Sequence, residues 1–181
     1  MTDVLVGLTG RKGSGKDTAA EAMFGFENVK MAGALKAMLG ALLTYQGALP
    51  GTVHRMLEGD LKEKPTSLLG GRSPRHAMQT LGTEWGRNLI STDLWIGVAE
   101  RRIGLFDQVC VSDVRFPNEA NMIRRLGGRT YRIERGADAD AVCDPHVSEA
   151  GIDDLQVDGV IENDCPSANA FKALMREMFL D

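Results

Sequence analysis

Short apolar runs alternate with amphipathic segments along most of the chain. Five runs have the length and composition of buried strands, namely residues 4–8, 28–32, 109–111, 130–134 and 157–161, of which the second is the weakest. Segments with apolar residues three and four positions apart follow these runs, which is the spacing of helices. The alternation predicts a parallel sheet with helices on both faces, the α/β class.

Two of the helical segments have clear apolar stripes. One begins at Gly33, and its stripe consists of Leu35, Met38, Leu39 and Leu42. The last one follows Pro166–Ser167, a helix start signal, and its stripe consists of Phe171, Leu174, Met175 and Met178. In both cases the spacing predicts one buried face.

Residues 47–104 interrupt the alternation. They contain no strand-like run, and basic residues, short helical patterns and glycine breaks follow one another there. Ser73–Pro74 indicates the start of a helix, with serine as the cap and proline in the first turn. Its stripe consists of Met78, Leu81, Trp85 and Leu89. We predict that 47–104 is a helical insertion that forms one wall of a cleft. The alternative is a plain helical subdomain with Trp85 and Trp95 in its core.

The helix after Ser73 also contains two glycines, Gly82 and Gly86, one turn apart. Each costs about 1 kcal/mol of helix stability relative to alanine. Their missing side chains must therefore serve a purpose. We expect either another backbone or a ligand to pack against this part of the helix.

The first apolar run leads into a glycine-rich loop. Residues 10–16 read Gly-Arg-Lys-Gly-Ser-Gly-Lys, and a helical pattern starts directly after them. A strand, this loop and a helix start form the context in which the G-x-x-x-x-G-K motif binds phosphate. Glycines let the backbone curl around an anion, and the helix dipole favours its charge. The predicted nucleotide-binding residues are Gly13, Ser14, Gly15, Lys16, Asp17 and Thr18, with Lys16 neutralising the outer phosphates.

Asp17 departs from the usual motif, in which serine or threonine follows the lysine and holds Mg²⁺. Here the hydroxyl comes one position later, at Thr18. One interpretation is that Asp17 holds Mg²⁺ directly or through water while Thr18 binds a phosphate oxygen. The other is that Asp17 only pairs favourably with the helix dipole. Asp17 and Thr18 are therefore the candidate metal ligands.

Composition and charge narrow the class of protein. The 181 residues are 43% hydrophobic and 25% charged, as in a globular domain, and the net charge of −4 disfavours stable binding to nucleic acid. The three cysteines are widely spaced, which fits a reducing compartment. Because the chain shows neither a signal peptide nor a membrane-spanning stretch, we expect a cytoplasmic protein without a membrane partner.

Most other candidate site residues are cationic: Lys12, Lys36, Arg75, Arg87 and Arg115. Asp113 directly follows the run 109–111, and the carboxyl ends of parallel strands are where nucleotide sites form. A site rich in cations and without a nucleophile–base pair suits phosphoryl transfer to an acceptor that is already a phosphate. A monophosphate is largely dianionic, since its second pKa is about 6, and needs no general base. Arginine grips such groups with two hydrogen bonds.

The chain resembles the bacteriophage-type deoxynucleoside monophosphate kinases. The resemblance is carried by GRKGSGKDT at 10–18, Leu35–Lys36, the segment from Arg75 to Gln79, LGTEWGR at 81–87, Trp95, DVRFPNE at 113–119 and HVSE at 146–149. It implies a P-loop kinase fold over 1–181, with strand order 2-3-1-4-5 and a helical acceptor-binding insertion. It also implies transfer of the γ-phosphoryl group of ATP, with Mg²⁺, to a deoxynucleoside monophosphate for DNA precursor synthesis. If the protein is encoded by a phage, it would act in the host cytoplasm.

The resemblance further implies which residues face the acceptor: Lys12, Lys36, Arg75, Gly82, Thr83, Arg87, Trp95, Asp113, Arg115 and Glu119. Lys16, Arg115 and Arg87 are the predicted catalytic residues. For Asp113 and Glu119 three roles stay open: reading the sugar or base, positioning Arg115, or ordering metal-bound water. For Glu119 a favourable interaction with its helix dipole is a further alternative.

Other functions remain as alternatives. A dephospho-coenzyme A kinase or another small-molecule P-loop kinase would need a base for a hydroxyl acceptor, and Asp113 is the candidate. A nucleotide-dependent regulatory binding module is a rival of another class. Residues 135–151 form a long polar segment that we interpret as a lid or mobile loop. The sequence leaves the choice between monomer and homodimer open.

Overall fold

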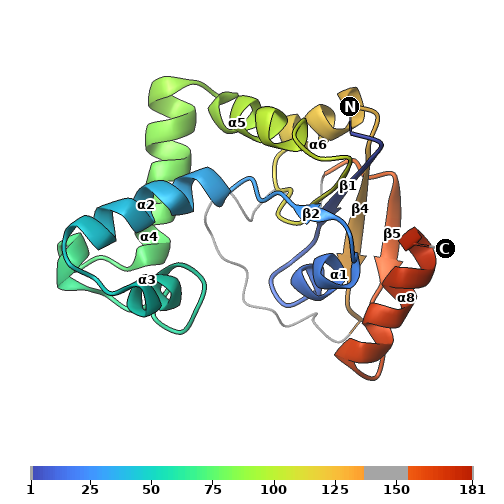
Figure 1. Ribbon diagram of the computed structural model, residues 1–181, viewed down its shortest axis with the longest axis horizontal. Helices are drawn as coiled ribbons and strands as arrows, with labels where there is room; N and C mark the ends of the chain where they lie inside the picture. Colours follow the sequence, from blue (N-terminus) through green and yellow to red (C-terminus); the bar gives the residue numbers. More distant parts are fainter. Residues whose placement is uncertain (1, 137–154, 181) are drawn as a thin grey trace. The chain divides into compact units, whose positions relative to one another are not determined.

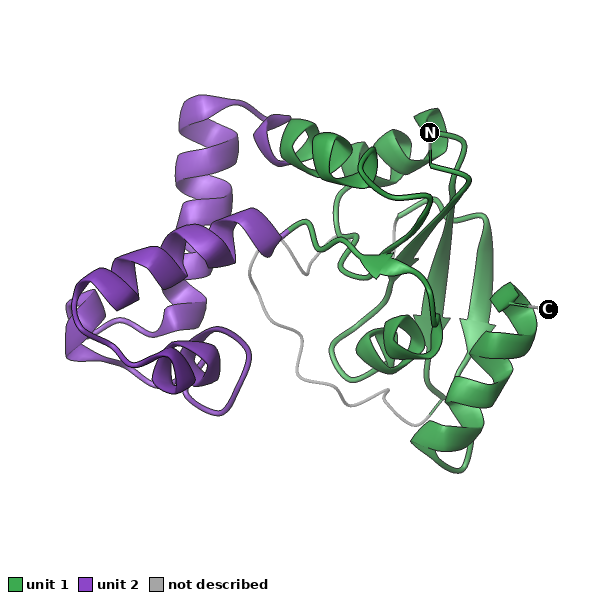
Figure 2. Cartoon of the chain, viewed as in Figure 1, with its two compact units in different colours: residues 1–31, 96–181 green, residues 32–95 purple. Residues whose placement is uncertain are grey.

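The computed structural model describes residues 2–136 and 155–180 (Figure 1). They divide into two compact units (Figure 2). The first comprises residues 1–31 and 96–181, and the second comprises residues 32–95. The first unit contains the sheet and the glycine loop, and the second is helical, so each is described by itself.

The first unit is built on five parallel strands in the order β2-β3-β1-β4-β5 (Figure 1). The strands are β1 (Val4–Thr9), β2 (Glu27–Asn28), β3 (Gln108–Val111), β4 (Arg129–Glu134) and β5 (Gly159–Glu162). This confirms the predicted fold class and the predicted strand order 2-3-1-4-5. With β1 in the centre, the glycine loop that follows it lies at the carboxyl edge of the sheet.

The second strand is shorter and earlier than the predicted 28–32. The amide of Val29 still donates to the carbonyl oxygen of Cys110 on β3, at 2.9 Å. The amide of Met31 instead donates to the Asp113 carboxylate at 2.6 Å. The backbone therefore leaves the hydrogen-bond ladder with β3, because the Asp113 side chain takes the place of the next main-chain carbonyl group as the acceptor.

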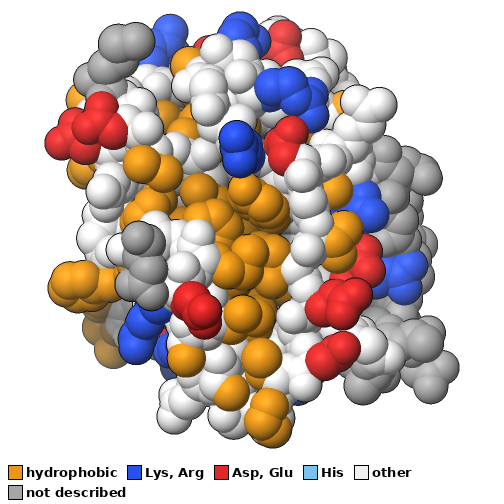
Figure 3. Space-filling view, turned by 90° about the vertical axis from the view of Figure 1, so that its right-hand side faces the viewer, with side chains coloured by type: hydrophobic (Ala, Val, Ile, Leu, Met, Phe, Trp, Pro, Cys, Tyr) orange, Lys and Arg blue, Asp and Glu red, His pale blue; other side chains and the backbone are white. Residues whose placement is uncertain are grey.

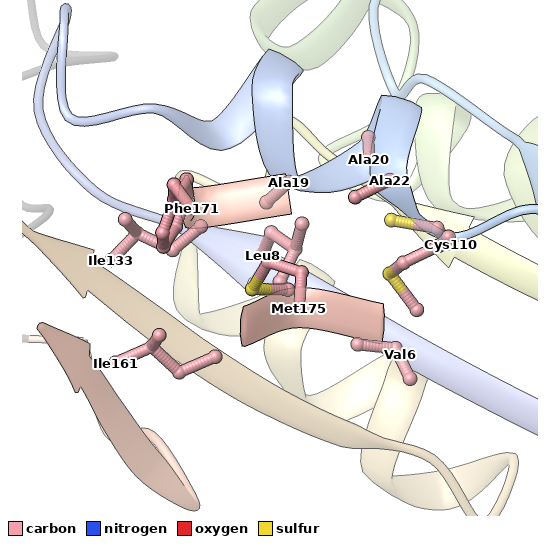
Figure 4. Close-up of a cluster of buried hydrophobic side chains, with 11 residues drawn as sticks. Val6, Leu8, Ala19, Ala20, Ala22, Cys110, Ile133, Ile161, Phe171 and Met175 are labelled. Carbon is pink, nitrogen blue, oxygen red and sulfur yellow. The ribbon is translucent and has the colours of Figure 1, made fainter. Parts of the chain in front are cut away.

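One hydrophobic core cluster of the first unit lies between the sheet and two helices, α1 (Lys16–Ala22) and α8 (Ala168–Leu180). Figure 4 shows side chains of both helices pointing toward those of β1, β4 and β5. Phe171 and Met175 of α8 are buried as predicted, whereas Met178 is 46% exposed. The helix α6 (Pro117–Arg125) completes the α/β pattern.

Hydrophobic side chains also reach the surface of the first unit. Figure 3 shows them gathered in the middle of one face, with acidic and basic side chains around them. Exposed hydrophobic residues of β5 and α8 include Val160, Met178 and Leu180. No helix in the described part of the chain is long and apolar enough to cross a membrane.

The second unit consists of short helices. They are α2 (Gly33–Tyr45), α3 (Pro50–Leu57), the 3-10 turn η1 (Ser67–Leu69), α4 (Pro74–Thr80) and the π-helix η2 (Leu81–Ile90). Ser73 caps α4, because its hydroxyl accepts a hydrogen bond from the amide of His76 at 3.2 Å. The next helix, α5 (Leu94–Ile103), begins in this unit and ends in the first.

The buried stripe of α2 differs from the predicted one. Leu35 and Leu39 are buried together with Leu43, while Met38 is 43% and Leu42 is 49% exposed. The buried positions are thus four residues apart. A stripe of this spacing is narrower than the predicted face, which also included positions three residues apart.

The predicted continuous helix after Ser73 changes type at Leu81. The amide of Ser91 donates to the carbonyl oxygen of Gly86, five residues earlier, at 3.0 Å. Hydrogen bonds of this span define a π-helix, whose wider turn rotates an α-helical stripe out of line. Consequently Met78 is buried, but Trp85 is 37% and Leu89 is 76% exposed.

The predicted segments map onto the units as follows. Residues 47–95 of the predicted insertion lie in the helical unit, which begins earlier, at residue 32, and residues 96–104 lie in the first unit. An acceptor-binding role for the insertion stays a prediction. Of the predicted lid at 135–151, all but residues 135 and 136 lies outside the described residues, as does His146.

Candidate nucleotide-binding site

The glycine loop adopts a backbone conformation that side chains rarely allow. Gly10, Gly13 and Gly15 have φ angles of 140°, 88° and 108°. The strand before the loop ends at Thr9, and α1 begins at Lys16. The structure therefore places the motif in the strand–loop–helix context that the sequence predicts.

Lys16 folds back over this loop. Its ammonium group donates to the carbonyl oxygens of Gly10 and Arg11, both at 2.6 Å. These contacts hold the cation at the loop, where an incoming phosphate would compete with two neutral acceptors. A charged phosphate oxygen is the stronger hydrogen-bond partner for an ammonium group.

Asn163 fixes the loop from the side. Its amide nitrogen donates to the carbonyl oxygen of Ser14 at 2.8 Å, and the residue is only 7% exposed. A Cβ atom on Gly15 would lie 2.5 Å from that nitrogen, so only glycine fits there. Asn163 was not among the predicted site residues. Its signal was a polar residue directly after the last strand, at the same carboxyl edge that drew attention to Asp113.

Two buried hydroxyl groups accompany the loop. Ser14 Oγ and Thr9 Oγ1 have no hydrogen-bond partner within the described residues. A buried polar group without a partner costs about 1–3 kcal/mol. For Ser14, inside the loop, a phosphate oxygen would supply the acceptor. The loop therefore fits the phosphates of a nucleotide.

Asp17 lies in the first turn of α1 and is 81% exposed. Lys30 donates to its carboxylate at 3.2 Å. Within the described residues no group of three or more histidine, cysteine or acidic residues could hold a metal ion. Mg²⁺ is commonly bound through one or two carboxylates together with substrate phosphates. The oxygen atoms of Asp17 and Thr18 fit that kind of site.

Ser112 anchors the end of β2, and Asp113 anchors the chain that follows it. One oxygen of Asp113 accepts from the amide of Met31 at 2.6 Å, and Ser112 Oγ donates to Asn28 Oδ1 at 2.8 Å. Cys110 is fully buried in β3, the strand that ends just before Ser112, and burial, with a smaller contribution from Asp113, raises its pKa to about 12. This thiol is therefore neutral and unreactive at neutral pH.

Glu119 holds the backbone that carries Arg115. One carboxylate oxygen accepts from the amides of Arg115 and Phe116, at 2.7 and 3.2 Å, and the residue is 2% exposed. Just before this segment, the amide of Val114 donates to the carbonyl oxygen of Leu8 on β1 at 3.1 Å. The contacts fit the role of positioning Arg115, one of the three roles that the sequence left open.

Two predicted acceptor-binding cations in the helical unit are paired with carboxylates. Lys36 donates to both oxygens of Glu58 at 2.8 Å, and Arg75 lies 3.4 Å from Glu63. The side chains of Lys36 and Arg75 are only 15% and 17% exposed. Neither glutamate stood out in the sequence, because an isolated acidic residue in a helical segment is usually a solvated charge.

A tryptophan side chain fills the space beside Gly86, the second of the two helix glycines, whereas a Cβ atom on Gly82 would meet only Leu35, at 3.4 Å. The Trp95 indole nitrogen donates to the carbonyl oxygen of Gly82 at 2.8 Å, and the ring is 4% exposed. A Cβ atom on Gly86 would lie 2.5 Å from the indole nitrogen. From the sequence, a backbone or a ligand was expected here. The structure shows a packed side chain instead.

The remaining predicted residues are also divided between the two units. In the first unit Lys12 is exposed on the glycine loop. In the helical unit Thr83 is partly buried on the π-helix, and an Arg87 guanidinium nitrogen lies 3.5 Å from the carbonyl oxygen of Thr92. Binding of an acceptor by these residues stays a prediction.

Comparison with known proteins identifies the family. Residues 60–173 match the family described as deoxynucleotide monophosphate kinase. A protein of Acanthamoeba polyphaga mimivirus, provisionally named a deoxynucleotide monophosphate kinase, is 33% identical over 163 residues, 81% of this chain and 80% of that protein. The chain belongs to the deoxynucleotide monophosphate kinase family.

Two further likenesses accompany this assignment. The deoxynucleoside-5'-monophosphate kinase of Escherichia phage T5 is 41% identical over 54 residues, 29% of this chain and 22% of that enzyme. The crystal structure of TT1252 from Thermus thermophilus is similar to this chain, with a TM-score of 0.51 and 16% sequence identity. The match covers 98% of this chain and 97% of that chain. At that identity the second likeness shows the fold alone.

The family assignment confirms the predicted resemblance and makes the protein a kinase. Membership implies the use of ATP and of small nucleotide substrates. It favours a deoxynucleotide monophosphate kinase over the dephospho-coenzyme A kinase and the regulatory binding module that the sequence had left as alternatives.

Proposed function

We propose that the protein transfers the γ-phosphoryl group of ATP to a deoxynucleoside monophosphate, giving a deoxynucleoside diphosphate and ADP for DNA synthesis. The observation that carries the proposal is the glycine loop with Lys16 over it, in a chain of this family. The buried Ser14 hydroxyl, which finds no partner in the described part of the chain, supports phosphate binding at the same place.

Gly13, Ser14, Gly15, Lys16 and Thr18 would bind the ATP phosphates. Asp17 and Thr18 would hold Mg²⁺, directly or through water. When bound, this ion supplies positive charge that offsets the charge of the phosphates. Lys16 and Arg115 would stabilise the phosphoryl group in transfer. Each side chain acts through its charge and position, so no proton has to be removed from the acceptor.

The helical unit would hold the acceptor. Lys36, Arg75 and Arg87 are its predicted phosphate-binding cations, and the first two are already held by Glu58 and Glu63. Gly82 and Thr83 contribute the π-helix surface. The buried Trp95 supports that surface through its hydrogen bond to the carbonyl oxygen of Gly82. Asp113 and Glu119 act mainly by fixing the backbone at Met31 and Arg115.

A substrate panel tests the proposal. ADP release is measured in a coupled assay with ATP and each of the common deoxynucleoside and ribonucleoside monophosphates, with dephospho-coenzyme A as a hydroxyl acceptor. We expect ADP release that requires a deoxynucleoside monophosphate. Release with dephospho-coenzyme A alone, or release without any second molecule, would contradict the proposed acceptor.

A further inference from the structure

Lys30 is held in place from both sides. Before it, Asn28 Oδ1 accepts a hydrogen bond from Ser112 Oγ at 2.8 Å. After it, the amide of Met31 donates to Asp113 at 2.6 Å. Both anchors lie at the carboxyl end of β3. The backbone of Lys30 is therefore fixed to the edge of the sheet next to the strand that leads into the glycine loop.

The side chain of Lys30 reaches the helix that follows this loop. Its ammonium group lies 3.2 Å from the carboxylate of Asp17, the residue directly after Lys16. Asp17 stands where the usual motif has a neutral hydroxyl residue. A carboxylate at this position adds negative charge beside a loop whose task is to bind an anion. Lys30 supplies the charge that compensates it.

We propose that Lys30 is a positioning residue for the donor site: it neutralises Asp17, so that the glycine loop keeps its affinity for a nucleoside triphosphate. The inference rests on the proposed function. Without Lys30, the Asp17 carboxylate repels the phosphates. If Asp17 is also made neutral, Lys30 is no longer needed. This dependence distinguishes a lysine that acts through Asp17 from one that binds the phosphate itself.

A double-mutant cycle tests this dependence. ATP binding is measured by titration calorimetry in EDTA, so that no metal ion competes for Asp17. The variants are Lys30→Met, Asp17→Asn and the double variant. Lys30→Arg is added as the conservative replacement. Circular dichroism checks that each variant is folded.

A second ion pair that involves α1 provides a matched control. Lys172 of α8 pairs with Glu21 of α1 at 2.7 Å, and its side chain is 29% exposed against 31% for Lys30. Lys172→Met removes an equivalent ion pair farther along α1. It should leave ATP binding unchanged, because this pair does not involve a residue of the glycine loop.

We expect Lys30→Met to weaken ATP binding about tenfold, as an uncompensated charge a few ångströms from a polyanion would. Lys30→Arg and the double variant should bind within about twofold of the parent, and Asp17→Asn at least as tightly as the parent. The inference is overturned if Lys30→Met binds like the parent, if the double variant stays as weak as Lys30→Met, or if Asp17→Asn binds more weakly. If the parent binds no ATP, the proposed function fails and this inference with it.

Discussion

A methyl group at Gly86 should destabilise the helical unit, because the Trp95 indole already occupies its position. An ideal Cβ atom on Gly86 would lie 2.5 Å from the indole nitrogen and 2.6 Å from two ring carbons. The ring cannot move aside freely, since it is 4% exposed and its nitrogen donates to Gly82. Gly86→Ala therefore forces the ring from its site.

Three contributions determine the size of the effect. Overpacking of a filled site costs about 1–3 kcal/mol. Loss of the Trp95–Gly82 hydrogen bond costs about 1 kcal/mol more. The replacement of glycine by alanine stabilises a helix by about 1 kcal/mol, which offsets part of this loss. The free energy of unfolding should thus fall by about 2 kcal/mol.

Urea denaturation followed by tryptophan fluorescence reports on the helical unit. The reason is that Trp85 and Trp95 are the two tryptophans of the chain and both lie in residues 32–95. Gly51→Ala in α3 is the control, since a Cβ atom there meets nothing within 4 Å. We expect the control to be neutral or stabilising. If Gly86→Ala is as stable as the control, Trp95 does not occupy the space beside Gly86.

Three further predictions concern the reaction and the core. Lys16→Ala should abolish phosphoryl transfer while the melting temperature stays near that of the parent, and turnover within about tenfold of the parent would contradict its catalytic role. Arg115→Lys should lower kcat by roughly tenfold or more, because the fork is lost, whereas Arg87→Lys should raise KM for the acceptor with little change in kcat. Steady-state kinetics of both variants decides this, and two variants that behave like the parent would mean that the acceptor site is misplaced. Because the Cys110 pKa is raised to about 12, the unfolded chain loses this proton first as the pH rises. The free energy of unfolding should then fall by about 1.4 kcal/mol per pH unit above about pH 9. Urea titrations of the parent and of Cys110→Ala measure the slope, and equal slopes would refute it.

The family, the fold and the glycine loop could be predicted from the sequence because their signals are local. The glycines at 10, 13 and 15 have backbone conformations that residues with a side chain rarely adopt, so the spacing of these glycines alone predicts the loop. The apolar runs predict strands because a parallel sheet is buried on both faces. The second strand was placed less well, since its end depends on a hydrogen bond from Met31 to Asp113, more than eighty positions away in the chain.

The partners of the site residues were decided only by the tertiary structure. Asn163 reaches Ser14 across 149 positions of the chain, and Lys30 meets Asp17 because the segment after β2 lies beside the first turn of α1. The contact of the Trp95 side chain with Gly86 and Gly82 of the π-helix is likewise a matter of tertiary packing. Sequence patterns report which residues are polar, apolar or flexible. Which charges meet is set by packing, because contacts between distant segments leave no periodic signal in the chain.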